Sequence, residues 1–170
     1  MSKKLLILAL VFLLVASTTA YATAYLTPNG DNVDSGGHLD WDSNTKYLSD
    51  CNTAQSVWNG YKSGVIRKDS FWVIEDIFVS DYYDSTETRF AYRRQSNSTI
   101  NFNDYYFVLG NSQSLTAEQR TKTVIHEFGH ALGLGHNTSS NPAIMRQGRF
   151  EYKTLHQDDK DSFDEAEKAY

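Results

Sequence analysis

The 170-residue sequence predicts a single α+β domain, in which β-strands pack against helices. Two patterns lead to this class. Residues 71–79 are apolar, β-branched and aromatic, which is typical of a central strand buried on both faces. In residues 50–63, apolar side chains recur at spacings of three and four, which indicates an amphipathic helix. A chain of this length supports one domain with a substantial core.

The chain begins with a pattern typical of a secretory signal peptide, which we place at residues 1–22. Two lysines precede an apolar run from Leu5 to Ala16, and Ala20-Tyr21-Ala22 offers a small-residue cleavage site, with Ala22-Thr23-Ala24 as the alternative. The run is too short to anchor a protein permanently in a bilayer, and no second run follows. We therefore expect a secreted, extracellular and monomeric protein without a stable membrane anchor.

The charge of the chain excludes one class of partner. Without the two signal lysines, 14 basic residues remain against 21 acidic ones, a formal charge of −7. A nucleic-acid partner would require a basic face, so we expect none. The single cysteine, Cys51, cannot form an internal disulfide, and we interpret it as a small, half-buried residue.

Residues 23–37 form a short leader before the domain proper, which we place at residues 38–170. The leader is polar and rich in turn-forming residues, so we expect a flexible segment or loop. A first strand, or a strand and a turn, is expected between Leu39 and Tyr47. The helix at residues 50–63 follows, and its apolar stripe consists of Ala54, Val57, Trp58 and Tyr61.

After the central strand at 71–79, two further strands are expected at residues 88–95 and 99–103. In the first of these, polar and apolar residues alternate, as in a half-exposed strand.

Thr116 and Gln119 are spaced as a capping box at the start of a helix. The core stripe of this helix consists of Val124, Ile125, Phe128, Ala131 and Leu132. The last helix is expected from about Asp158 to Tyr170, where the acidic start favours the positive end of the helix dipole. Its buried side consists of Phe163, Ala166 and Tyr170.

The pattern H-E-x-x-H-x-x-G-x-x-H begins at His126. Residues i and i+4 lie on one face of a helix, so His126 and His130 can present two imidazoles to a single ion, with Glu127 beside them. Gly133 can adopt a left-handed conformation, which would end the helix and let the returning chain bring His136 to the same ion.

Three neutral histidines around Zn²⁺ leave one position for water, which is typical of a catalytic site. The metal lowers the pKa of that water, and Glu127 is placed to accept its proton as a general base. The alternative is an ordinary amphipathic helix that carries histidines by chance, but the extended pattern argues against it. We therefore predict one catalytic Zn²⁺ with His126, His130 and His136 as ligands.

The same residues resemble the zinc signature of the metzincin metalloendopeptidases, and Asn141-Pro142-Ala143-Ile144-Met145 is similar to the Met-turn of that class. The resemblance implies that Met145 lies beneath the metal-bound histidines, although a methionine can also simply fill the core. It also implies a metzincin-like α+β fold: a twisted, mixed β-sheet of about five strands with an active-site helix, a backing helix and a C-terminal helix after the Met-turn.

Within the metzincins, the chain is most similar to the matrixins, the matrix metalloproteinase-like branch, in a minimal single-domain form. Gln147 stands where astacin-like and serralysin-like members carry a tyrosine. The run His-Glu-Phe-Gly-His-Ala-Leu-Gly-Leu-Gly-His and the paired aspartates Asp158 and Asp159 are similar to the matrixins. The resemblance is specific over residues 114–170, whereas residues 39–110 are only compatible with it.

The matrixin resemblance implies how a substrate binds. Residues 88–95, lying over 99–103, would form an antiparallel edge strand that pairs with an extended peptide. Arg146–Lys153 would form the wall of the pocket for the residue after the cleaved bond. Many matrixins hold a second, structural zinc, but His38 and His156 alone cannot rebuild that site, so we expect one zinc only.

Two other metal-related hypotheses remain open. Ca²⁺ is possible because residues 29–34 and 81–84 are rich in Asp and Asn, although such residues also form turns. The leader could also act as a pro-segment, with Asp31 or Asp34 occupying the open zinc position. The alternative is a plain linker.

These observations predict a secreted zinc endopeptidase that hydrolyses protein or peptide substrates, with Glu127 as the catalytic base. Two other classes remain open. One is a secreted zinc-binding module that recognises peptides or proteins without turnover, although Glu127 would then be unnecessary. The other is a zinc hydrolase of a small amide or ester, which an extended cleft would disfavour.

Overall fold

The computed structural model describes residues 23–70 and 74–170, so the expected signal segment at 1–22 lies outside the described residues. Five strands form one mixed sheet in the order β2-β1-β3-β5-β4, and only β4 runs antiparallel to its neighbour. The strands are β1 (Leu39–Ser43), β2 (Ile66–Lys68), β3 (Ile77–Tyr82), β4 (Ala91–Arg94) and β5 (Thr99–Asn103). This sheet confirms the predicted α+β class.

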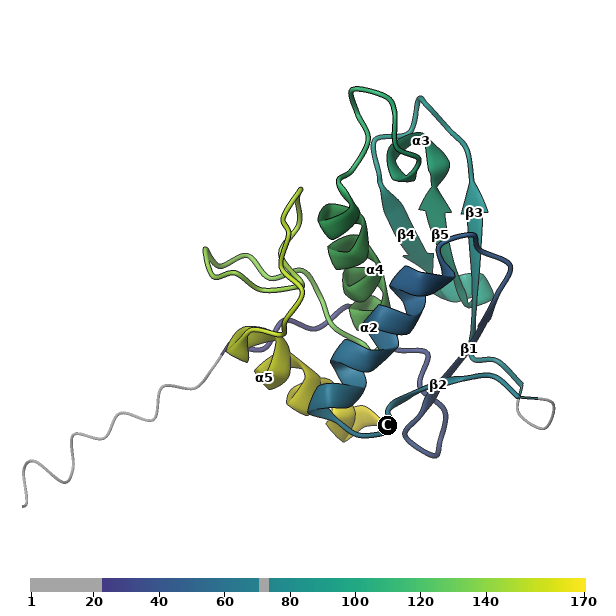
Figure 1. The fold of residues 1–170 in the computed structure, drawn as a ribbon. Coiled ribbons are helices and arrows are strands. Elements are labelled where there is room, and N and C mark those ends of the chain that lie inside the picture. Colours follow the sequence, from purple (N-terminus) through teal and green to yellow (C-terminus); the bar gives the residue numbers. More distant parts are fainter. Residues whose placement is uncertain (1–22, 71–73) are drawn as a thin grey trace, which may run out of the picture.

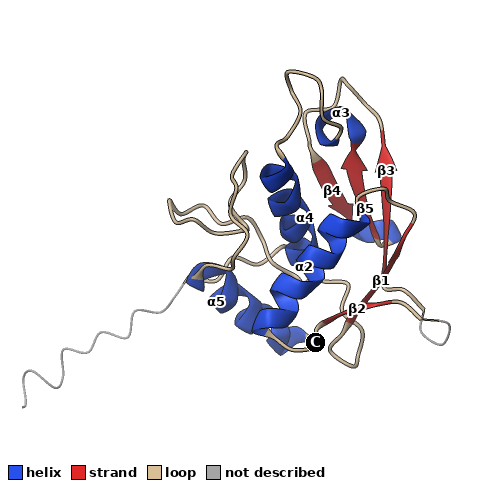
Figure 2. Cartoon of the chain, in the orientation of Figure 1, coloured by secondary structure: helices blue, strands red, loops and turns tan. Residues whose placement is uncertain are grey.

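The long helices α2 and α4 lie side by side against the sheet, while α5 lies near the C-terminus, at the end opposite α3 (Figures 1 and 2). The helices are α2 (Leu48–Tyr61), α3 (Asp104–Phe107), α4 (Ala117–Ala131) and α5 (Gln157–Ala166), with short 3-10 helices at Gln95–Asn97 and Glu167–Ala169. Within the described residues, no helix is long and apolar enough to cross a membrane.

The core forms between the sheet and the two long helices. Trp41 of β1 meets Phe128 of α4 edge to face, with ring centroids 5.6 Å apart. Trp58 of α2 is fully buried and donates its indole N–H to the carbonyl oxygen of Ile125 at 3.1 Å. The predicted stripe of α4 is buried throughout. These contacts fix the rotation of α4 about its own axis. The histidines of α4 therefore lie on its opposite side.

Helix α2, which was predicted at residues 50–63, begins and ends two residues earlier than expected, at Leu48 and Tyr61. In its predicted apolar stripe, Ala54 and Trp58 are buried, Val57 is half-buried and Tyr61 is exposed. Cys51 is fully buried rather than half-buried, and burial raises the pKa of its thiol.

The predicted strand at 71–79 was wrong in its boundaries. Residues 71–73 lie outside the described residues, and β3 begins only at Ile77, which pairs with Trp41. Ile74 is 87% exposed, so the apolar run is not buried along its whole length. The run resembles a central strand in composition, but within its described part, residues 74–79, only Phe78 and Val79 have a partner residue on each side.

Two short elements and one boundary were not predicted. β2 has three residues and α3 has four, which is too short for either periodicity to show. The strand predicted at 88–95 is shorter than expected, since β4 begins only at Ala91 and ends at Arg94, where the chain passes into a 3-10 turn at Gln95. Ser98 after this turn takes a left-handed φ of 49°.

The leader is not a free segment in this structure, which corrects the expectation of a flexible one. Leu26 forms an isolated antiparallel bridge with Leu134. The Thr27 N–H donates to the carbonyl oxygen of Gly133 at 2.9 Å, and the Gly135 N–H donates to that of Tyr25 at 2.7 Å. The leader therefore lies along the turn that follows α4.

Candidate metal centre

Helix α4 begins with the predicted capping box. The Gln119 N–H donates to the Thr116 hydroxyl at 3.2 Å, and the Thr116 N–H donates to the Gln119 side chain at 3.1 Å. The helix ends at Ala131, and Gly133 takes a φ of +88°, which is unfavourable for any residue with a Cβ. Gly133 thus has the left-handed conformation that the sequence predicts, and the chain turns back toward the helix.

That turn brings His136 to His126 and His130. Ring nitrogens of the three side chains lie within 4.8 Å of one another. The Nδ1 atom of His126 lies 2.9 Å from the carbonyl oxygen of Ile144, and that of His130 lies 2.7 Å from the carbonyl oxygen of Leu134. Since a carbonyl only accepts, each Nδ1 carries the proton, and each Nε2 presents a lone pair.

The three histidines fit a cation. The Nε2 atoms of His130 and His136 face each other at 3.0 Å. Burial lowers the pKa of all three side chains, His126, His130 and His136. The pKa of His126 falls far below its usual value, and that of His130 falls to about 4. Neutral imidazoles with converging lone pairs are the donor set that Zn²⁺ takes in catalytic sites.

Glu127 lies beside this group and is 5% exposed. Its Oε2 atom is buried and has no hydrogen-bond partner among the described residues. Burial raises the pKa of Glu127 to about 7, although the positive charges of Lys122 and Arg93 oppose this shift. A carboxyl group poised near neutrality can both accept and donate a proton at physiological pH.

Met145 packs against Gly129 of α4. It is 1% exposed, and a Cβ atom built on Gly129 would overlap its sulfur. A larger residue at position 129 would therefore have to displace the Met145 side chain. The Met145 N–H donates to Asp159 of α5 at 3.0 Å, and the Ile144 N–H donates to the same carboxylate at 2.8 Å.

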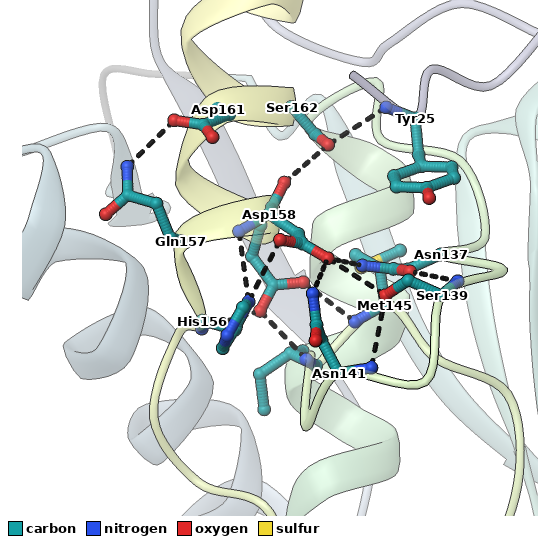
Figure 3. A network of polar contacts seen from close by, with 12 residues as sticks. Tyr25, Asn137, Ser139, Asn141, Met145, His156, Gln157, Asp158, Asp161 and Ser162 are labelled. Carbon is teal, nitrogen blue, oxygen red and sulfur yellow. Dashed lines mark hydrogen bonds and ion pairs between the residues drawn. The ribbon is translucent and has the colours of Figure 1, made fainter. Parts of the chain in front are cut away.

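The neighbouring aspartate, Asp158, ties the loop after His136 to the start of α5 (Figure 3). Its Oδ2 atom accepts hydrogen bonds from Asn137 at 2.9 Å, Ser139 at 3.0 Å and Asn141 at 2.9 Å. Burial opposes ionisation of Asp158, but these three donors outweigh it and lower its pKa to about 2.

A cavity of about 560 Å³ opens over the histidines and Glu127. Its walls are residues 88–93, which include the start of the edge strand β4, together with residues 26–29 of the leader and Gln147-Gly148. Because β4 pairs only with β5 in the described sheet, its other edge is free to pair with an extended peptide. The predicted edge strand is therefore present and lines the cavity.

Neither Asp31 nor Asp34 joins the histidine group in this structure. Asp31 accepts from the Val33 N–H, and Asp34 accepts from the N–H groups of Gly36 and His38. The leader reaches the cavity through residues 26–29 instead.

The other residues considered for metal binding have structural partners. Asp34 forms a group with Asp40 and Asp76, but the Arg67 guanidinium lies on it, 2.6 Å from Asp40. Among the described residues, the loop at 81–84 contributes to no group of three potential ligands.

Two cavity residues were overlooked in the sequence, Lys122 and Arg93. Lys122 stands four residues before His126, so it shares the histidine face of α4, and this spacing could have been used to find it. Arg93 is on the edge strand, where the face that it occupies depends on the register of the sheet.

An α+β fold with a mixed β-sheet, three converging histidines and an adjacent buried glutamate defines a zinc-dependent peptidase. The matrixin family model matches residues 18–166, and the chain belongs to the matrixin family. It is therefore a zinc metalloendopeptidase, as the sequence resemblance implied. No curated protein matches the chain in sequence.

The solved structures that match the chain are distant from it in sequence. A GM1-bound form of the ECX AB5 holotoxin is 14% identical, with a TM-score of 0.49, and the match covers 85% of this chain and 90% of that one. Archaemetzincin from Archaeoglobus fulgidus is 13% identical, with a TM-score of 0.41, covering 74% and 98%. High choriolytic enzyme 1, a hatching-enzyme zinc protease from Oryzias latipes, is 14% identical, with a TM-score of 0.36, covering 67% and 53%.

Proposed function

We propose that this matrixin is a secreted endopeptidase in which His126, His130 and His136 hold one Zn²⁺ and Glu127 is the general base. The observation that carries the proposal is the buried, unpartnered Oε2 atom of Glu127 beside three histidines whose free lone pairs converge. Secretion is supported by the signal-like pattern of residues 1–22.

The zinc, when bound, supplies an acidified water and polarises the carbonyl group of the substrate. Glu127 then accepts a proton from the attacking water and returns it to the leaving amine. Its pKa of about 7 suits both directions of transfer. The free edge of β4 would align an extended peptide by strand addition, so that an internal peptide bond lies over the histidines.

A cleavage experiment tests the proposal. The protein starting at residue 23 would be incubated with a denatured protein and with a peptide library, with and without a zinc chelator, and the products would be mapped. We expect internal cuts that the chelator abolishes. Glu127→Ala should lower turnover by roughly 10²–10⁴-fold while the zinc content stays at one ion per chain.

Glu118→Ala is the matched control, because Glu118 lies on the same helix but in its exposed first turn. It should cut like the unmodified protein. Undiminished turnover in Glu127→Ala would overturn the assignment of the base. Bound zinc without any cutting would favour the binding module, and cleavage confined to small amides would favour the small-amide hydrolase. Sequencing the amino terminus of the exported protein tests the signal segment.

A further inference from the structure

The charges that line the cavity are almost all positive, although the chain as a whole has a formal charge of −5. Apart from Glu127, the charged lining residues are Arg89, Arg93 and Lys122. Arg89 is neutralised by an ion pair with Glu87 at 2.6 Å. Lys122 and Arg93 are therefore the two cations of the cavity that have no carboxylate in an ion pair with them among the described residues.

Lys122 is the more unusual of the two. It is 2% exposed, and its ammonium group donates to the carbonyl oxygen of Arg146, which carries no charge. Among the described residues it has no ion pair within 4.0 Å. An ammonium group has three donors, so the bond to Arg146 leaves donors for another acceptor. Burial lowers the pKa of Lys122 to about 8, which still leaves it mostly charged at neutral pH.

Arg93 adds a second cation with neutral partners. Its guanidinium donates to the side-chain oxygen of Asn32 at 2.6 Å and to the carbonyl oxygen of Gly30 at 2.8 Å, and its buried Nη2 atom has no partner among the described residues. Glu127 is thus the one carboxylate among the residues that line the cavity, which also include the buried Lys122 and the half-buried Arg93. Buried charges are costly unless they are paired, so the cavity favours a further anion.

We propose that the cavity selects substrates with an acidic side chain next to the scissile bond, and that Lys122 binds this carboxylate. Arg93 contributes to the positive potential of the cavity, while its Nε and Nη1 atoms hold the leader. The inference rests on the proposed endopeptidase function, and it makes Lys122 a specificity-determining residue.

A different role for Lys122 is to keep Glu127 ionised. The two roles differ in what a substitution changes. If Lys122 acts only on Glu127, its replacement slows all substrates by the same factor. If it binds a substrate carboxylate, its replacement slows acidic substrates more than their neutral analogues.

The test uses pairs of quenched peptides that differ only by Glu or Gln at one position, scanned over the residues on both sides of the bond cut in the peptide library. At one position we expect the Glu peptide to have a kcat/KM about tenfold higher than the Gln peptide. Lys122→Gln, which can still donate to Arg146, should bring this ratio close to one. Lys122→Met, which keeps the length of the side chain, should do the same.

Lys168→Gln is the control, because Lys168 is exposed on the C-terminal 3-10 helix, and it should keep the full ratio. A ratio near one in the unmodified protein, or an equal slowing of both peptides by Lys122→Gln, would overturn the proposal. If the unmodified protein cuts no peptide at all, the endopeptidase function fails, and binding then decides the role of Lys122. Tighter binding of the Glu peptide to Glu127→Ala, lost on adding Lys122→Gln, would support the Lys122 site, and equal binding of both peptides would overturn it.

Discussion

The Asp159 carboxylate accepts a hydrogen bond from the backbone N–H of Met145 at 3.0 Å, and this bond joins α5 to the turn beneath the histidines. The same carboxylate accepts from the N–H groups of Ile144 and His156, each at 2.8 Å, and Asp159 is 1% exposed. Since the carbonyl oxygen of Ile144 bonds the ring of His126, Asp159 acts on the site through the backbone of Ile144.

Replacement of Asp159 by Asn should therefore destabilise the fold and weaken the metal site together. The amide has one acceptor oxygen in place of two and turns a donor toward a backbone N–H, so at least one buried donor loses its partner. We expect a loss of about 2–3 kcal/mol in the free energy of unfolding, measured by urea denaturation, and weaker zinc binding. Asp161→Asn is the control, because Asp161 is a half-buried residue of the same helix that accepts from the Gln157 side chain rather than from the backbone beneath the site. It should change the stability by less than about 0.5 kcal/mol. Equal effects of the two substitutions would contradict this role.

The contact between Gly129 and Met145 predicts opposite outcomes for two Gly→Ala substitutions. At Gly129 a Cβ would overlap the Met145 sulfur and approach the Trp58 ring at 3.0 Å, so Gly129→Ala should cost about 1–3 kcal/mol of stability. Gly60 lies in α2 with open space at its Cβ position, and Gly60→Ala should stabilise by about 0.5–1 kcal/mol. Thermal unfolding of both variants gives the comparison, and a stabilising Gly129→Ala would show that the packing under α4 is looser than described.

The parts of the site that could be predicted from sequence are those fixed by local geometry. The capping box at Thr116, the histidine spacing on α4 and the left-handed turn at Gly133 each depend on residues a few positions apart. The same holds for Lys122, whose place on the histidine face of α4 follows from its spacing of four residues from His126.

The parts that could not be predicted depend on contacts between distant segments. The leader is held because its backbone lies against Gly135, where a Cβ would overlap the carbonyl oxygen of Leu26, and no local pattern reveals this fit. In the same way, residues 74–76 lie outside the strand, and β3 begins at Ile77, where β1 and then β5 lie beside it. Composition alone could not show where that pairing starts.

The hydrogen bonds to Asp158 predict how stability depends on acid. Its pKa is about 2 in the folded protein and about 3.9 in an unfolded chain, so the carboxylate adds stability above pH of about 4. This contribution is lost as the pH falls from about 4 through 2, because the folded state must then also take up the proton. The side chain is 21% exposed, so we expect a contribution of about 1–2 kcal/mol. Urea denaturation of Asp158→Asn should show this deficit at pH 7 and none near pH 2, whereas a deficit that persists at pH 2 would assign it to packing.

Zinc should stabilise the folded chain through the three histidines, and this effect can be measured without any substrate. A ligand that binds only the folded state at 100 times its Kd adds about 2.7 kcal/mol, which for a domain of this size raises Tm by about 5–10 °C. The rise should appear on adding Zn²⁺ to chelator-treated protein and should be absent in His126→Ala. His38→Ala is the control, because His38 lies outside the histidine group and contacts the carbonyl oxygen of Gly64. It should keep the full rise, even if its own Tm is lower. An unchanged rise in His126→Ala would place the ion elsewhere on the molecule and remove the basis for assigning Glu127 as the base.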